Sequence, residues 1–207
     1  MITKKKIILF DLDGVLIDSK KNMLKAWKKV QKKHGIEIKF KKYFENIGLP
    51  FQDILKKIKI KKNIKEIEKT YKEESFKNLK KIKIFPGVIV FLRYLIKNKI
   101  KIGIVTSKDK ERTLIIIKKL KVNFNIVVCP SKNLRGKPYP DQINKALKKF
   151  SENKKYACYV GDTKVDFIAA KRAGIDFIFA SYGYGTGKYK VKINRLSYLK
   201  NYCALTK

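Results

Sequence analysis

Two carboxylates separated by one residue follow an apolar segment near the start of the chain. Ile7–Phe10 is made of branched and aromatic residues, and Asp11, Leu12, Asp13 and Gly14 come directly after it. Such a segment is typical of a buried parallel strand, and open α/β sheets bind ligands at the carboxyl ends of their strands. Acids held close together repel each other, so a bound cation is the simplest reason for keeping both. The spacing therefore predicts a metal-assisted site at this strand end.

Polar side chains also follow two later segments with strand character. Thr106 and Ser107 end one of them, Asp162 ends another, and Lys137 lies in a Gly-Lys-Pro loop after a further strand. A parallel sheet brings these ends to one edge, which predicts one site with acids, hydroxyls and a fixed ammonium. This set suits phosphoryl transfer, in which carboxylates hold a divalent metal while ammonium and hydroxyl groups bind phosphoryl oxygens.

The segments beyond residue 85 alternate between helical and strand patterns. The predicted elements are helix 88–98, strand 100–105, helix 109–120, strand 124–129, helix 140–150, strand 156–160, helix 164–173, strand 175–180 and a short helix at 198–203. Strands that alternate with helices imply a parallel sheet joined by right-handed crossovers. We therefore predict an α/β fold, with a three-layer Rossmann-like core built on a parallel sheet.

The stretch between the first strand and residue 85 differs from the rest. It is lysine-rich and helical in pattern, with Met23 and Trp27 on one helix face, and nothing in it is typical of a strand of the main sheet. The chain is therefore expected to divide into a core domain formed by residues 1–16 and 85–207 and an inserted all-helical domain formed by residues 17–84.

The chain is strongly basic, and nearly all of its cationic residues are lysines. Lys and Arg total 52 against 17 Asp and Glu, a formal net charge of +35, and only five of the 52 are arginine. Arginine is the side chain whose planar fork suits phosphates and base edges, and the lysines are spread through every segment. We expect no specific nucleic-acid partner, although the charge should attract anionic ligands.

Several classes of site and location are excluded by what the sequence lacks. The three cysteines form no close pair and His34 is the single histidine, which disfavours His/Cys zinc sites and Ser-His-Asp triads. No apolar run reaches the roughly 18 residues that a membrane helix needs, and the first residues lack the features of a secretory signal. We expect a cytoplasmic protein with no membrane partner, either a monomer or a homodimer.

Four groups of residues resemble, in order, the four motifs of the haloacid dehalogenase superfamily. They are Asp11-x-Asp13-Gly14-Val15, Val105-Thr106, Lys137-Pro138 and Gly161-Asp162-Thr163-x-x-Asp166. The resemblance covers nearly the whole chain and is closest to the branch that includes phosphoglycolate phosphatases and β-phosphoglucomutases. Members of that branch carry a helical cap after the first motif, and the insertion at 17–84 resembles it.

The resemblance implies a role for each matching side chain. Asp11 matches the nucleophile that forms an aspartyl-phosphate, and Asp13 matches the general acid and base. Thr106 matches the residue that hydrogen-bonds a phosphoryl oxygen, and Ser107 beside it is a further candidate for binding substrate. Lys137 matches the lysine that neutralises charge around the nucleophile and the phosphate.

The same resemblance implies a magnesium ion. Its predicted ligands are a carboxylate oxygen of Asp11, the backbone carbonyl of Asp13 and the carboxylate of Asp162, with Asp166 supporting the metal through water. An acid at position 166 would also favour the start of a helix, which is an alternative reason for its presence. Because Asp11 and Asp13 have different tasks, the chain must leave regular strand geometry after Leu12, and Gly14 is placed to permit that turn.

The expected function is that of a Mg²⁺-dependent phosphatase acting on a small phosphorylated metabolite, of the phosphoglycolate or sugar phosphate type. A β-phosphoglucomutase-like mutase is an alternative, although Met23 occupies the position of that enzyme's cap histidine and Gly161 that of the glutamate just before the aspartate of its fourth motif. A phosphonate hydrolase, which uses a cap lysine, is another alternative. A different class is a basic protein that binds polyanions on the same scaffold. The natural substrate is not indicated.

Overall fold

The first strand lies at the centre of a six-stranded sheet. The computed structural model describes residues 3–204, so residues 1–2 and 205–207 of the predicted core domain lie outside the described part. The strands are β1 (Ile7–Phe10), β4 (Lys101–Val105), β5 (Ile126–Val128), β6 (Ala157–Gly161), β7 (Asp176–Ala180) and β8 (Lys192–Ile193). They are arranged in the order β5-β4-β1-β6-β7-β8, and every neighbouring pair is parallel. The carboxyl ends of the strands consequently share one edge of the sheet.

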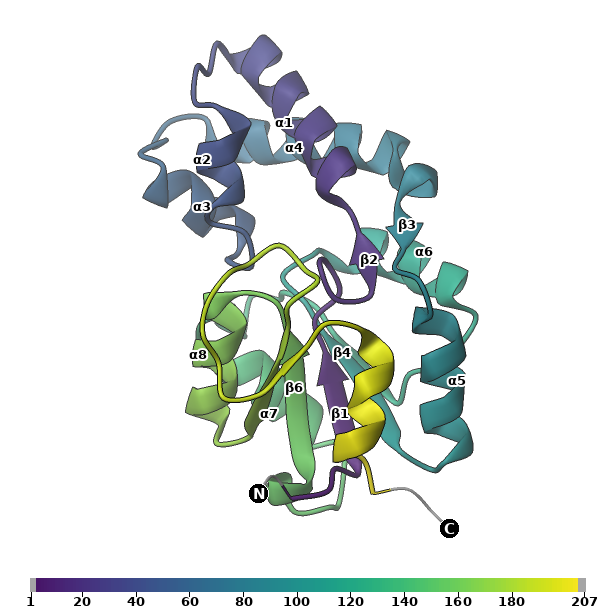
Figure 1. Cartoon of the computed structure of the whole chain (residues 1–207). Coiled ribbons are helices and arrows are strands. Elements are labelled where there is room, and N and C mark those ends of the chain that lie inside the picture. The colour runs from purple at the N-terminus through teal and green to yellow at the C-terminus, as the bar shows by residue number, and fades with distance from the viewer. Residues whose placement is uncertain (1–2, 205–207) are drawn as a thin grey trace.

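Helices cover both faces of this sheet, because successive side chains of a strand point to opposite sides. Along β1, Ile8 and Phe10 join one apolar cluster, whereas Ile7 and Leu9 join another. The first cluster includes side chains of α5 (Val88–Lys97), α6 (Lys110–Leu120) and the 3₁₀ helix η3 (Leu196–Tyr202), and the second includes side chains of α7 (Asp141–Leu147) and α8 (Lys164–Ala173). The predicted three-layer α/β core is confirmed (Figure 1).

The predicted elements differ from the structure mainly at the edges of the sheet. The strand expected at 124–129 is confined to β5, because Asn125 uses both its backbone N–H and its side-chain oxygen to pair with Ile102. The two-residue strand β8 was not predicted, and the helix expected at 198–203 is the 3₁₀ helix η3. A short 3₁₀ helix, η2 (Lys154–Tyr156), precedes β6.

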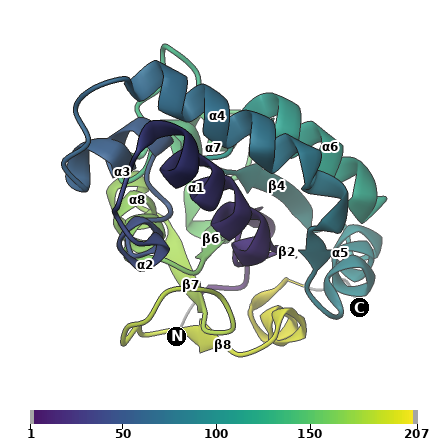
Figure 2. The same ribbon diagram turned by 90° about the horizontal axis from the view of Figure 1, so that it is seen from above.

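The inserted segment is helical and lies over the carboxyl edge of the sheet. It contains α1 (Lys20–His34), α2 (Phe40–Phe44), α3 (Phe51–Lys57), α4 (Ile64–Lys77) and the 3₁₀ helix η1 (Leu79–Lys81). In Figure 1 these helices stand above the end of β1, and Figure 2 shows α1 and α4 crossing over the sheet when it is viewed from that side. Two short antiparallel strands, β2 (Ile17–Asp18) and β3 (Lys83–Ile84), connect the insert to the core.

The insert has an apolar core of its own. Trp27 is fully buried and its ring stacks on that of Tyr43, with 4.6 Å between the centroids. The cluster around this pair shares no buried member with the two clusters that flank the sheet. Helix α1 ends at Gly35, which adopts the left-handed conformation that favours glycine after a helix.

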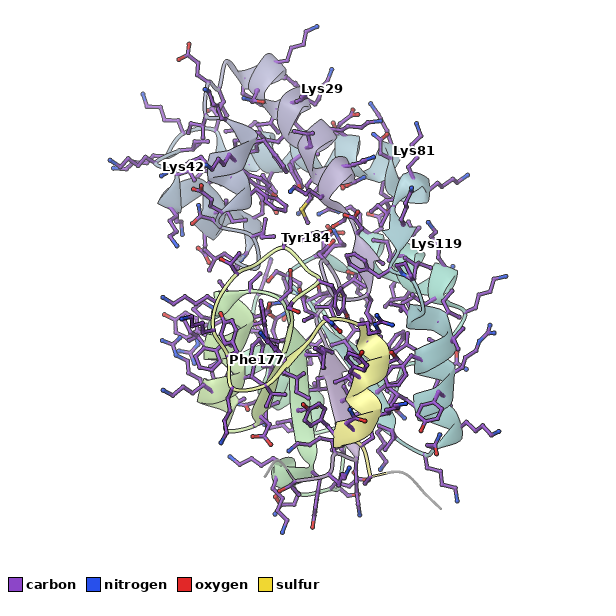
Figure 3. The ribbon with its side chains drawn as sticks, in the orientation of Figure 1. Lys29, Lys42, Lys81, Lys119, Phe177 and Tyr184 are labelled. Atoms are coloured by element: carbon purple, nitrogen blue, oxygen red, sulfur yellow. The ribbon has the colours of Figure 1, made fainter. Side chains whose placement is uncertain are left out.

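Lysines such as Lys29 and Lys42 are exposed, and Figure 3 shows them pointing outward from the insert. This arrangement agrees with a solvated surface charge rather than a concentrated patch. Within residues 3–204, the helices are too short or too polar to cross a lipid bilayer.

Candidate active site

Asp11 and Asp13 lie at a sharp change in the direction of the chain. Strand β1 ends at Phe10, and the backbone of Asp11 still pairs with β6 by donating to the carbonyl of Val160. Gly14 then adopts a φ of 85°, and its N–H donates to the carbonyl of Ile17, which turns the chain back toward β2. The two acids therefore meet different partners, as the sequence requires.

Lys137 is the centre of the charge network around Asp11. The side chain is 1% exposed, and its ammonium donates to Asp11 Oδ1 at 2.9 Å, to Asp166 Oδ1 at 2.8 Å and to the hydroxyl of Tyr159 at 3.1 Å. Burial alone would lower the pKa of Lys137, but the carboxylates of Asp11 and Asp166 outweigh it and hold that pKa well above its usual range. The ammonium is therefore permanently charged beside Asp11.

Asp166 is fully engaged by protein donors. Its Oδ1 accepts from Lys137, and its Oδ2 accepts from the backbone N–H of Thr163 at 3.0 Å and from the Thr163 hydroxyl at 2.6 Å. Thr163 and Asp166 thereby form a capping box that begins α8. The structure therefore shows Asp166 starting a helix and contacting Lys137, whereas its support of a metal through water stays a prediction.

Asp162 is buried, and one of its two carboxylate oxygens lacks a hydrogen-bond partner among the described residues. Its Oδ2 accepts from the backbone N–H of Tyr184 at 2.7 Å, whereas its buried Oδ1 has no hydrogen-bond partner among the described residues. Gly14 and Gly183 pack against this carboxylate so closely that a Cβ on either would overlap it. A buried carboxylate oxygen without a donor is costly, so this oxygen suits a cation.

Three buried carboxylates are close enough to hold one metal ion. Asp11, Asp162 and Asp166 each offer an oxygen, and these oxygens lie within 4.8 Å of one another. The side chain of Asp13 is outside this group, and the contribution expected of its backbone carbonyl stays a prediction. An all-oxygen set suits a hard divalent cation, and the unpartnered oxygen of Asp162 makes the site fit one.

The pKa values of the acids in the metal-free site also indicate that a cation binds there. Burial raises the pKa of Asp11 to about 7, against the opposing effect of Lys137. Burial, together with the negative charges of Asp166 and Asp11, raises the pKa of Asp162 well above its usual range. Ionised carboxylates are therefore unfavourable here unless a cation compensates them.

The variant Asp162→Asn is expected to stabilise the metal-free protein at neutral pH and to abolish its stabilisation by Mg²⁺. Because the pKa of Asp162 is raised on folding, its ionisation lowers stability as pH rises from its ordinary value of about 4 through its raised value. The gain should be about 1–2 kcal/mol, or a few degrees in melting temperature. Thermal unfolding with and without Mg²⁺, at acid and neutral pH, measures both effects.

Asp53→Asn is the matched control, because Asp53 is exposed on α3 and its loss changes the net charge by the same amount. It should leave the effect of Mg²⁺ intact. An Asp162→Asn protein that is still stabilised by Mg²⁺ as strongly as the wild type would contradict the assigned metal site.

Thr106 and Ser107 lie where the sequence predicts, at the end of β4. The Thr106 hydroxyl accepts from the backbone N–H of Lys108 at 3.2 Å, and the Ser107 hydroxyl donates to the carbonyl of Gly48 in the insert at 2.7 Å. Ser107 is therefore also a contact between core and insert.

A cavity of about 70 Å³ lies between the core and the insert, large enough for a few water molecules. Of the site residues predicted from the sequence, five line this cavity: Asp11, Asp13, Thr106, Ser107 and Lys137. Asp162 and Asp166 do not line it but lie against Asp11. The insert contributes mainly apolar and aromatic side chains, namely Met23, Tyr43, Ile47, Leu49, Phe51, Ile54 and Tyr71. The cations on its wall, Lys108, Arg112 and Lys137, all belong to the core.

Four further side chains at the site were not predicted to act there. Asp13 Oδ1 accepts from the Ser19 hydroxyl at 2.5 Å and lies 3.1 Å from the Lys108 ammonium. Ser19 precedes α1 but makes no capping bond with its side chain. Tyr184, near the centre of Figure 3, accepts from the Ser19 N–H at 2.6 Å through its hydroxyl. Arg112 was not singled out among the many basic residues, although its position six residues after Thr106 could have indicated that it lies near the site.

The arrangement defines an α/β enzyme whose charged site lies between a parallel sheet and an inserted helical layer. The model of the haloacid dehalogenase-like hydrolase family matches residues 8–180, and the chain belongs to this family. The family predicted from the four motifs is thereby confirmed, as is the prediction of a hydrolase.

Named relatives match over most of their length. A phosphoglycolate phosphatase of Aquifex aeolicus is 31% identical over 186 residues, which cover 86% of each chain. A phosphorylated carbohydrates phosphatase of Thermotoga maritima is 26% identical, covering 83% of each chain. The crystal structure of a hydrolase from Pseudomonas syringae superposes with a TM-score of 0.85 at 25% identity, over 95% of this chain and 97% of that one.

Proposed function

We propose that this hydrolase is a Mg²⁺-dependent phosphatase that removes the phosphoryl group of a small phosphorylated metabolite through an aspartyl-phosphate on Asp11. The observation that carries the proposal is the contact of the Lys137 ammonium with Asp11, beside the unpartnered oxygen of Asp162. A buried carboxylate, a fixed positive charge and a candidate metal position at one point support Asp11 as the nucleophile. Relatives with phosphatase names support the reaction class.

In the first step, an oxygen of Asp11 attacks phosphorus while the bond from phosphorus to the leaving oxygen breaks. Asp13 gives its proton to that oxygen, so the alcohol leaves neutral. In the second step, Asp13 takes a proton from water, the water oxygen attacks phosphorus, and the bond to Asp11 breaks. Inorganic phosphate, the Asp11 carboxylate and a protonated Asp13 remain, which is the state that began the first step.

The other predicted residues would stabilise this chemistry rather than exchange atoms. Lys137 and the hydroxyls of Thr106 and Ser107 would bind phosphoryl oxygens, although Ser107 must release Gly48 to do so. Magnesium would be held by Asp11, Asp162 and the backbone carbonyl of Asp13, with Asp166 in support. When bound, the ion would neutralise the charge of the phosphoryl oxygens.

We further propose that residues 17–84 act as a cap domain on the core formed by residues 1–16 and 85–207. The separate apolar core of the insert and the two-stranded connection β2–β3 support two bodies joined at a hinge. Closure over the cavity would exclude water before the first step and set specificity. The cytoplasmic location and the monomeric or homodimeric state stay predictions.

The alternatives within the family receive less support from the cavity. Met23 lines it where a mutase would carry histidine, and the lysines of the insert, which a phosphonate hydrolase of this family would need, are absent from the described lining. The polyanion-binding alternative does not explain the buried carboxylate–lysine network, since such a network offers no accessible positive surface.

The test is hydrolysis of a generic phosphate ester with and without Mg²⁺ by the wild type and by Asp11→Asn. We expect hydrolysis by the wild type only, and only with the metal. Equal rates in the wild type and the variant would contradict the proposal.

A further inference from the structure

Two buried cations of the cavity have no task in the reaction as described. Lys108 is 8% exposed and Arg112 is 7% exposed, and both line the cavity wall. Lys108 precedes α6 and Arg112 lies in its first turn, so both are carried by the core rather than by the insert. Buried cations are uncommon unless they are paired, so their partners are informative.

The contacts of these two side chains leave donors unused. Lys108 has one charged partner among the described residues, Asp13, although an ammonium offers three donors. Arg112 donates through Nε to Asp109 and through Nη1 to the Ser75 hydroxyl at 2.7 Å, and its Nη2 lies 2.5 Å from the same Asp109 oxygen. A guanidinium offers five donors, so two of them remain. Buried donors are normally satisfied, which indicates an acceptor within the cavity.

The position of the pair identifies the part of the substrate that it faces. The Lys108 ammonium lies 3.1 Å from Asp13, the acid proposed to protonate the leaving oxygen, whereas Lys137 lies beside the nucleophile. Lys108 is therefore on the leaving-group side of the reacting phosphorus. Arg112 is closer to the insert, with its guanidinium 5.8 Å from the ring of Tyr71.

The remaining wall on that side limits the chemistry of the leaving group. Met23, Phe51 and Ile54 of the insert offer no hydrogen-bonding group, and Tyr43 and Tyr71 add only one hydroxyl each, so most hydroxyls of a sugar would be buried against hydrocarbon at a cost. A compact anion would instead meet two cations, and arginine suits the planar geometry of a carboxylate or phosphate. The cavity of about 70 Å³ also favours a short leaving group.

We propose that Lys108 and Arg112 bind a second anionic group, a carboxylate or a phosphate, carried by the leaving group of the substrate. This proposal rests on the proposed phosphatase function and specifies its substrate class. The preferred substrates are small phosphate esters or anhydrides with a second negative charge close to the scissile bond. Neutral sugar-type leaving groups are disfavoured.

The test compares kcat/KM for phosphoglycolate, for pyrophosphate and for the neutral amide of phosphoglycolate, which has the same shape. In the wild type, at least one of the two anionic substrates should exceed the amide by about 100-fold, and the better one identifies carboxylate or phosphate as the bound group. Arg112→Gln and Lys108→Gln should each reduce this ratio by about 10- to 100-fold. The ratio removes any general loss of turnover that a variant causes.

Ser75→Ala is the matched control, because it removes the hydrogen bond from Arg112 to the insert and keeps the guanidinium. The ratio should stay as in the wild type. A wild type that does not prefer either anion over the amide would overturn the proposal. So would an unchanged ratio in Arg112→Gln and Lys108→Gln, or an equal fall in Ser75→Ala, which would make Arg112 a contact that only holds the insert. Failure to hydrolyse any of the three compounds would overturn this proposal alone if the generic phosphate ester is still hydrolysed, and would reject the phosphatase function itself if it is not.

Discussion

Lys137→Ala is expected to lower the turnover of a phosphate ester by at least about 100-fold. The ammonium is the donor that reaches Asp11, Asp166 and Tyr159 together, so its removal leaves two buried carboxylates without their cation. Breaking a buried pair in this way typically costs about 3–5 kcal/mol of stability. Steady-state kinetics at a temperature where the variant is folded, together with its melting curve, measure both losses.

Two further variants interpret this experiment: Lys137→Met separates the effect of charge from that of volume, and Lys145→Ala is the control. Methionine keeps most of the side-chain volume, so a similar loss in Lys137→Met assigns the effect to charge rather than to a cavity. Lys145 is exposed on α7, and its replacement should change little. Near-normal turnover by the folded Lys137→Ala protein would overturn the role given to the lysine.

Asp13→Asn is expected to reduce kcat by about 10²–10⁴-fold, because the acid that protonates the leaving oxygen and then activates water is lost. Asparagine keeps the shape of the side chain and can still accept from Ser19. The loss should be larger for an alkyl phosphate than for an aryl phosphate, since an aryl alcohol leaves without help from an acid.

The two esters also separate the two steps of the reaction. With the aryl ester, Asp13→Asn should release the first aryl alcohol quickly and then slow down, because water attack on the intermediate still needs a base. A stopped-flow record of alcohol release gives this burst. Equal losses for both esters with no burst would show that Asp13 does not act as the acid and base.

The sequence predicts best where a local signal and the packing agree. Helix α8 is found at the predicted residues because Thr163 and Asp166 form its capping box and Gly174 ends it in the left-handed conformation. The short edge elements are harder to predict, since the two residues of β8 carry no periodicity and are held by pairing with β7 and by the burial of Ile193.

The catalytic set of the candidate site follows from strand ends, because any parallel sheet gathers them at one edge. The substrate side does not follow in this way. Lys108 is one of many lysines in the sequence, and only the approach of α6 to the insert shows that it and Arg112 face the cavity. Likewise, the bond from Ser19 to Asp13 depends on the turn at Gly14, which residue types alone do not specify in detail.

The two acids that follow β1 are thus expected to be chemically unequal, with Asp11 forming a covalent bond and Asp13 moving protons. The most direct test is to quench the reaction with an aryl phosphate in acid, reduce the protein with borohydride, and locate the modified residue by peptide mass spectrometry. Reduction converts an aspartyl-phosphate to homoserine. We predict homoserine at position 11, most abundantly in Asp13→Asn. Product formation with an unmodified Asp11 in both proteins, or modification at Asp13 in the wild type, would contradict the account.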